Sequence, residues 1–267
     1  MTTKTMRNRI IRKRLNCLGR ISLLTVVLLL FFSPPSASSA DLASQFLPSG
    51  SSLAPGAWRY SEPAGRLIVS SEHKSVLALS SYRCLVRTFY HEGHDGDPLR
   101  ADEKMVLSVR KAGDIRVDLI RPRKGAWLIY RKDQDQDQVR VKPFSFLPMI
   151  LSLSPGSSLI TSRFGHTINH ADYGSFYARV LAPSCLLGGC VYLDRGVVMG
   201  HAVRVVNVAP VFGVARPIFG RMWVSFDTRT GLPVSISTMD ARGRFMERIT
   251  YDRCRLNPSF PKNFFRE

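Results

Sequence analysis

The feature that most constrains this chain is a series of ten short runs in which apolar and polar residues alternate. In the run "DIRVDLIRP", Ile115, Val117 and Leu119 fall on one face, while Arg116 and Asp118 fall on the other. Successive side chains of a strand point to opposite faces, so this period of two indicates strands with one apolar face. Glycine-containing turns separate the runs, which predicts a meandering antiparallel sheet. So long a sheet must curl or be covered.

Two stretches have a helical period instead. One is Arg66–Leu79, just ahead of the first strand. The other has an apolar stripe at positions i, i+3, i+4, i+7 and i+8, formed by Tyr173, Phe176, Tyr177, Val180 and Leu181. Asp172 is placed to cap its start, and Pro183 lies where we expect the helix to have ended. A helix of this kind belongs against the apolar face of the sheet, either as ordinary core or as a lid over a cavity.

The amino-terminal residues have the pattern of an export signal. Residues 1–40 combine a basic head, the apolar stretch "ISLLTVVLLLFF" and the small-residue end "SPPSASSA". We expect cleavage after Ala40, although retention as a membrane anchor is the alternative. Residues 41–63 are rich in Ser, Pro, Gly and Ala and are expected to be a linker. The globular domain is then residues 64–267, in the periplasm.

Charge narrows the set of partners. The whole chain carries +18, and loss of the seven Lys and Arg residues of the signal leaves +11. This excess favours anionic partners such as lipid head groups, lipopolysaccharide or polyanionic polymers of the cell wall. Nucleic acid would fit a cytosolic chain, but export argues against it. The alternative is a basic surface that serves solubility only.

Three histidine- or acid-rich stretches have the letters of metal sites. In "FYHEGHDGDP", His91 and His94 are three apart with glycines within and after the pair, which favours a turn over a zinc-binding helix. "DQDQDQ" lacks the glycine and final Glu of an EF-hand loop. His166 and His170 have the i, i+4 spacing but precede the regular helical period. We expect no metal and no cofactor.

Four cysteines remain after the signal, an even number for an oxidising compartment. They are Cys84, Cys185, Cys190 and Cys254, and three connectivities are open. We favour Cys185–Cys190, which closes a short glycine-bearing loop, and Cys84–Cys254, which ties the first strand to the last. A redox role for the Cys-x4-Cys pair is the alternative to structural bridges.

Several segments resemble the LolA/LolB-like superfamily, which contains lipoprotein carriers, and are closest to an exported bacterial family of uncharacterised function within it. They are "LALSSYRCLVRTFYHEG", "EKMVLSVRKAGDIRVDLIRPRKGAWLIY", "GHTINHADYGSF" and the closing "FDTRTGLPVSISTMDARGRFMERITYDRCRLNPSFPKNFF". The ordered set of matching positions is Tyr82, Val109-Arg110-Lys111, Gly231-Leu232-Pro233, Leu256-Asn257 and Phe264. The likeness covers residues 64–267 and supports a structural role for His166 and His170.

The resemblance implies an α+β fold: a curved antiparallel half-barrel of about ten to eleven strands, covered on its concave side by helices around a cavity for acyl chains. In the carriers an arginine before a proline on the second strand bonds to the lid. Arg110 and Lys111 match that position here, but Ala112 replaces the proline. The lid residues would then be Arg110, Lys111, Tyr173, Phe176, Tyr177 and Val180.

If the apolar face lines a cavity, twelve residues are expected on one concave surface: Val86, Leu107, Val109, Ile115, Val117, Leu119, Trp127, Ile129, Val224, Phe226, Val234 and Ile236. The rival hypothesis is a solid core built from the same strands.

The sequence favours a periplasmic binding protein that holds acyl chains of a lipid or lipoprotein and has a role in outer membrane biogenesis. One alternative is an envelope-stress sensor that binds an inner-membrane signalling protein. Another is a hydrolase of envelope polymers, but no Gly-x-Ser-x-Gly motif is present and the carboxylates are scattered. We therefore expect no enzymatic activity.

Overall fold

The computed structural model describes residues 62–91, 99–111, 113–132, 135–162, 164–209 and 219–266. The expected signal peptide and nearly all of the expected linker lie outside these residues, as does most of the "HEGHDGDP" turn. Within the described part, no helix is long and apolar enough to cross a bilayer.

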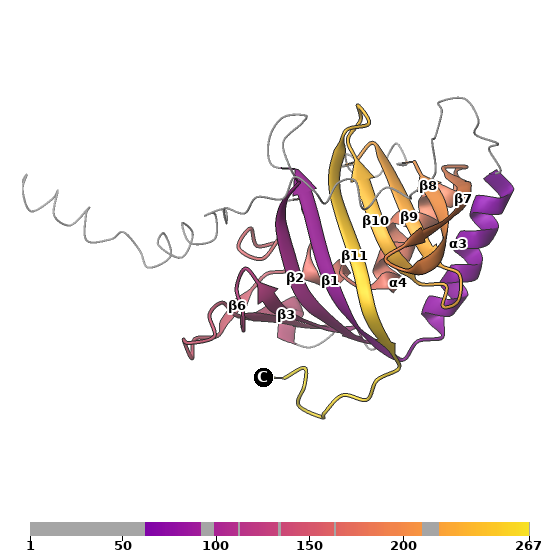
Figure 1. The fold of residues 1–267 in the computed structure, drawn as a ribbon. Coiled ribbons are helices and arrows are strands. Elements are labelled where there is room, and N and C mark those ends of the chain that lie inside the picture. Colours follow the sequence, from indigo (N-terminus) through magenta and orange to yellow (C-terminus); the bar gives the residue numbers. More distant parts are fainter. Residues whose placement is uncertain are drawn as a thin grey trace, which may run out of the picture. The chain divides into compact units, whose positions relative to one another are not determined.

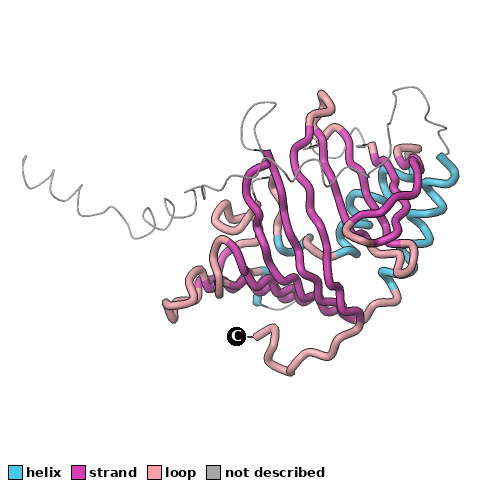
Figure 2. Tube along the Cα trace, viewed as in Figure 1, coloured by secondary structure: helices cyan, strands magenta, loops and turns pink. Residues whose placement is uncertain are grey.

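A single antiparallel sheet of eleven strands dominates the fold (Figures 1 and 2), and its order is β6-β5-β4-β3-β2-β1-β11-β10-β9-β8-β7. The sheet is open, since its two edge strands β6 and β7 do not pair with each other. The strands are β1 (Ser81–His91), β2 (Leu99–Arg110), β3 (Asp114–Arg121), β4 (Trp127–Arg131), β5 (Val139–Lys142), β6 (Leu151–Leu153), β7 (Cys190–Val198), β8 (His201–Val208), β9 (Arg221–Asp227), β10 (Pro233–Met239) and β11 (Phe245–Leu256). The predicted curved half-barrel of ten to eleven strands is confirmed.

The helices of the described residues are few, and all except α3 are short. They are α3 (Glu62–Leu77), the 3-10 turns η1 (Asp135–Asp137) and η2 (Ile168–His170), α4 (Tyr173–Phe176), the π-helical turn η3 (Tyr177–Leu181) and α5 (Ala182–Leu186). The first helix thus begins four residues before the predicted Arg66.

The central helix begins as predicted but ends later. Asp172 caps it, because its Oδ1 accepts a hydrogen bond from the Ser175 backbone N–H at 2.9 Å. Pro183 does not end it. Instead, Pro183 occupies the first turn of α5, where the missing N–H of proline costs nothing, and the helical path continues to Leu186.

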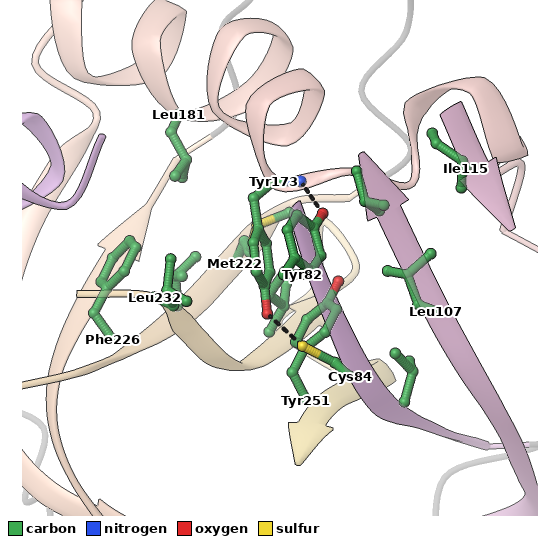
Figure 3. Packing of buried hydrophobic residues seen from close by; sticks show 14 of the residues in the cluster. Tyr82, Cys84, Leu107, Ile115, Tyr173, Leu181, Met222, Phe226, Leu232 and Tyr251 are labelled. Atoms are coloured by element: carbon green, nitrogen blue, oxygen red, sulfur yellow. Dashed lines mark hydrogen bonds between the residues drawn. The ribbon is translucent and has the colours of Figure 1, made fainter. Parts of the chain in front are cut away.

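One face of the sheet carries the main core, and we call it the inner face. Its cluster of buried apolar residues runs from Val139 and Val141 on β5 to Val206 and Val208 on β8. Helix α3 packs beside β7 and against α4 and α5. The close view in Figure 3 shows Tyr173 from the helical side reaching down between Tyr82 and Tyr251 of the sheet.

The opposite, outer face is crossed by the end of the chain. After β11 the chain turns back (Figure 1), and Asn257 fixes this turn by accepting hydrogen bonds from the backbone N–H and hydroxyl of Ser80. A second apolar cluster on this face contains Trp127, Ile129, Phe260, Phe264 and Phe265. The carboxyl-terminal segment therefore packs on the outside of β3 and β4.

Both favoured disulfides are present. Cys84–Cys254 joins the neighbouring strands β1 and β11, 170 residues apart in sequence, and Cys185–Cys190 closes the turn between α5 and β7. Two disulfides fit an oxidising compartment.

Candidate ligand-binding face

Most of the twelve residues predicted to share one concave surface lie together on the inner face. Eight belong to its buried cluster, namely Val86, Leu107, Val109, Ile115, Val117, Val224, Phe226 and Ile236. Leu119 is half-buried and packs against that cluster. Val234 is buried beside the irregular pairing between Pro233 and Ser235, but belongs to neither cluster. At their centre these residues form a packed core, because Ile115 and Val224 are almost completely buried.

Two of the twelve lie on the wrong face for that prediction. Trp127 pairs with Asp118 and Ile129 with Arg116, so both point outward with these polar residues and pack on Phe265. The inward positions of β4 belong to Leu128 and Tyr130 instead. The run "WLIY" is apolar on both faces because the carboxyl-terminal segment covers its outside, so alternation could not fix which residues point inward.

The predicted lid helix is anchored to the sheet by Tyr173. Its backbone N–H donates to the Tyr82 hydroxyl at 2.9 Å, and its own hydroxyl donates to the Pro233 carbonyl oxygen at 3.2 Å. The rings of Tyr82 and Tyr173 stack with centroids 4.6 Å apart (Figure 3). Burial raises the pKa values of both tyrosines well above the ordinary value, so both hydroxyls stay neutral.

The other predicted lid residues divide into two groups. Phe176, Tyr177 and Val180 are half-buried and pack against the inner-face cluster. Arg110, in contrast, lies on the outer face, where it pairs with Asp114 and its guanidinium lies 4.9 Å from the centroid of the Phe265 ring.

Lys111 contacts a helix other than the predicted lid. Its Nζ donates to the Leu77 carbonyl oxygen at 2.7 Å, at the end of α3. The arginine-to-lid contact of the carriers therefore has no counterpart at Arg110, which points to the other face.

The inner face has two different covers. Helices α3, α4 and α5 lie over the half toward β7. The half toward β6 is crossed by residues 154–162 and 164–172, which we call the covering segment. Its backbone closes local turns, such as Ile160 N–H to the Ser157 carbonyl oxygen at 3.0 Å. Ile160 and Ile168 of this segment pack on the inner-face cluster. Side chains, rather than a regular helix, therefore hold this cover to the sheet.

One polar contact ties the covering segment to the sheet. His166 Nε2 lies 2.7 Å from Oε2 of Glu247, a carboxylate on β11 that is only 2% exposed. Partial burial disfavours the charged imidazole, but the hydrogen bond and charge of Glu247 outweigh it and raise the pKa of His166. This histidine therefore stays protonated to a higher pH than an isolated one.

A second carboxylate, Glu103 of β2, lies near Glu247. Burial raises the pKa of Glu103, and the charge of Glu247 raises it further, while Arg123 opposes the change. The sequence could not indicate this cluster, because Glu247 lies 81 residues from His166. His170, the other predicted structural histidine, is the last residue of η2 and is exposed.

Within the described ranges, no three His, Cys, Asp or Glu side chains come together as a metal site. A hollow of about 510 Å³ lies next to β5 and β6, but its lining is polar and consists of Gln136, Gln138, Arg140 and Ser152. It does not offer the apolar surface that an acyl chain needs.

No protein-family model matches the sequence, and no curated protein matches it either. Solved structures do match. A LolA superfamily protein from Nitrosomonas europaea is 9% identical with a TM-score of 0.38, over 76% of this chain and 97% of that chain. The lipoprotein LppX of Mycobacterium tuberculosis is 14% identical with a TM-score of 0.44, over 75% of this chain and 99% of that chain.

The MucB structure from the MucA/MucB complex of Pseudomonas aeruginosa is 14% identical with a TM-score of 0.40, over 76% of this chain and 61% of that chain. LolA superfamily proteins are thus among the structures that this fold resembles, as the sequence motifs predict. Since each of these TM-scores is below 0.5, we take the function from the chain's own residues.

Proposed function

We propose that this protein is an exported binding protein that holds acyl chains of a lipid or lipoprotein against the inner face of its sheet. The observation that carries the proposal is the covering segment. It lies over a continuous apolar wall on β1–β6, yet turns and side-chain contacts hold it instead of a helix or strand ladder. Segments with few backbone bonds to their surroundings open at low free-energy cost.

Opening of the covering segment would uncover apolar residues that are already half-buried. Met105, Leu119, Leu151 and Leu153 all pack at the border of the inner-face cluster. An acyl chain replaces this segment on the wall, and each buried methylene contributes about 0.8 kcal/mol. Ten methylenes therefore give roughly 8 kcal/mol, the free energy of micromolar binding, and the further methylenes of a longer acyl chain offset the costs of ordering the ligand.

A saturation experiment with a dansyl-labelled fatty acid and with a diacylated lipopeptide tests this. The variant Leu119→Lys places a charge on the apolar wall, and we expect about tenfold or greater loss of affinity, because an unpaired buried charge is costly. The matched control is Ile120→Lys at the next position, whose side chain is 37% exposed. It should bind as the unaltered protein does.

Thermal melting of both variants separates binding from folding. The proposal is wrong if the folded protein takes up neither ligand at micromolar concentration, or if the two lysine variants bind equally well. Native mass spectrometry of protein taken from the periplasm identifies the cargo. A bound protein and no lipid would favour a sensor.

A further inference from the structure

The outer face of β11 and β1–β5 is strongly basic. Strand register fixes which side chains point outward, because neighbours across a ladder share a face. Eleven outward positions are basic: Arg83, Arg87, Lys104, Arg110, Arg116, Arg121, Arg131, Arg140, Lys142, Arg248 and Arg255. Among the side chains that the structure describes on these strands, the outward acidic ones are Asp114, Asp118 and Asp252. Much of the excess positive charge of the domain is therefore on one side of the sheet.

The arrangement places like charges directly opposite each other. Arg83 pairs with Arg255 across β1 and β11, and Arg87 pairs with Lys104 across β1 and β2. Like charges in directly opposed positions destabilise a sheet. Sheet stability alone does not account for two such pairs on one strand, whereas a bound anion would remove the repulsion.

The acids on this face do not neutralise these pairs. Asp114 bonds to Arg110, Asp118 to Arg116 and Asp252 to Arg253. The carboxyl-terminal segment also occupies part of the face, since Arg116 donates to the Phe264 carbonyl oxygen at 2.8 Å.

Arg87 also has a hydrogen-bond donor without an acceptor. Its Nε is buried and has no hydrogen-bond partner among the described residues. A buried guanidinium N–H without an acceptor is costly, so an outward movement of this half-buried side chain toward an anionic ligand is favoured.

We propose that this outer face, centred on Arg83, Arg87, Lys104 and Arg255, docks the protein onto an anionic phospholipid membrane. Six adjacent strands carry the basic side chains, and at about 4.8 Å per strand the array is about 20 Å or more wide. Such a two-dimensional array matches a surface of phosphates better than it matches a single linear polyanion.

The residues between the charges fit the same partner. Leu85 lies between Arg83 and Arg87 on the outer face and pairs with Val106, and both apolar side chains are only half-buried. Apolar side chains among basic ones strengthen binding to anionic bilayers, because the two contributions act together at the head-group boundary. This inference does not rest on the acyl-binding proposal, which concerns the opposite face.

The test is co-sedimentation of the exported protein with vesicles of phosphatidylcholine, with and without phosphatidylglycerol. We expect binding only to the anionic vesicles, and weaker binding at high salt. In the double variant Arg87→Gln/Lys104→Gln, the affinity for anionic vesicles should fall by about tenfold or more. The matched control, Arg195→Gln/Arg229→Gln, removes the same charge from exposed sites on β7 and after β9, and should bind almost as the unaltered protein does.

Thermal melting distinguishes a docking role from a structural one. Loss of the Arg87–Lys104 repulsion should leave the melting temperature unchanged or raise it, even while vesicle binding falls. Equal vesicle binding by the two double variants would overturn the proposal. So would binding of soluble polyphosphate by a protein that does not sediment with anionic vesicles.

Discussion

The two halves of the inner face are covered in ways that differ in kind. Over the half toward β7, helices α3–α5 pack on the sheet, and Tyr173 enters a buried group of Tyr82, Tyr251 and the Cys84–Cys254 bridge. Over the half toward β6, the covering segment closes turns on itself and reaches β11 through His166.

This difference shows where the domain can open without unfolding. The hydrogen bonds and stacked rings of Tyr173 and the Cys185–Cys190 bridge between α5 and β7 hold the helical half, so its separation from the sheet requires loss of the main core. Among the described residues, the covering segment is held by apolar and aromatic contacts, such as that of Phe164 with Tyr90, and by the partly exposed His166–Glu247 pair. Local opening follows the lower free-energy route, and ligand-binding elements come from such regions.

Removal of the long disulfide should give the largest effect, because Cys84–Cys254 joins β1 to β11 beneath Tyr173 and closes a loop of 170 residues. By the chain-entropy estimate, Cys84→Ala/Cys254→Ala lowers the free energy of unfolding by up to about 5 kcal/mol. The Cys185–Cys190 bridge closes a much shorter loop, so the variant Cys185→Ala/Cys190→Ala should lose about 2 kcal/mol of unfolding free energy. Urea denaturation of both variants measures the difference. A larger loss from the short bridge would contradict this order.

Removal of the hydrogen bonds of Tyr173 should cause the next largest loss of unfolding free energy. In Tyr82→Phe the Tyr173 backbone N–H loses its acceptor inside the core, which should cost about 1–3 kcal/mol. Tyr173→Phe removes the donor to the Pro233 carbonyl oxygen and should cost about 1 kcal/mol. Urea denaturation measures the free energy of unfolding of both variants. If the helical half opens only together with the main core, each loss appears in the global unfolding transition. A Tyr82→Phe variant as stable as the unaltered protein would show that this contact does not hold the helix.

The strands of this fold could be predicted because alternation is a local signal. Ten of the eleven strands coincide with alternating runs, and the missed one is β6, whose three residues are too few to show a period. The disulfides could be favoured from loop length and from the expected pairing of the first and last strands. Which residues of β4 point inward could not be predicted, since Trp127 and Ile129 on its outer side are covered by a segment that follows more than 120 residues later.

The polar features of the molecule depend on contacts that no local pattern shows. His166 drew attention through its spacing to His170, but its partner is Glu247 on the last strand. The outer basic face was equally hidden, because the charge total gives no location. Register was needed to show that Arg87 lies directly opposite Lys104.

The smallest expected effect concerns the pH dependence of the covering segment. The pKa of His166 is raised in the folded state by Glu247, so the protonated form stabilises the closed segment. This stabilisation is fully present below the unfolded pKa of about 6.5 and is lost as pH rises through the higher folded value. Because the imidazole is half-exposed, we expect this pair to stabilise the closed segment by no more than about 1 kcal/mol.

Amide exchange of the covering segment should therefore speed up at alkaline pH, relative to that of α3 and after correction for intrinsic exchange. His166→Gln should remove this dependence, whereas the matched variant His170→Gln should keep it. A dependence that persists in His166→Gln would assign the titration to another group, such as Glu103, and would show that His166 does not hold the segment closed.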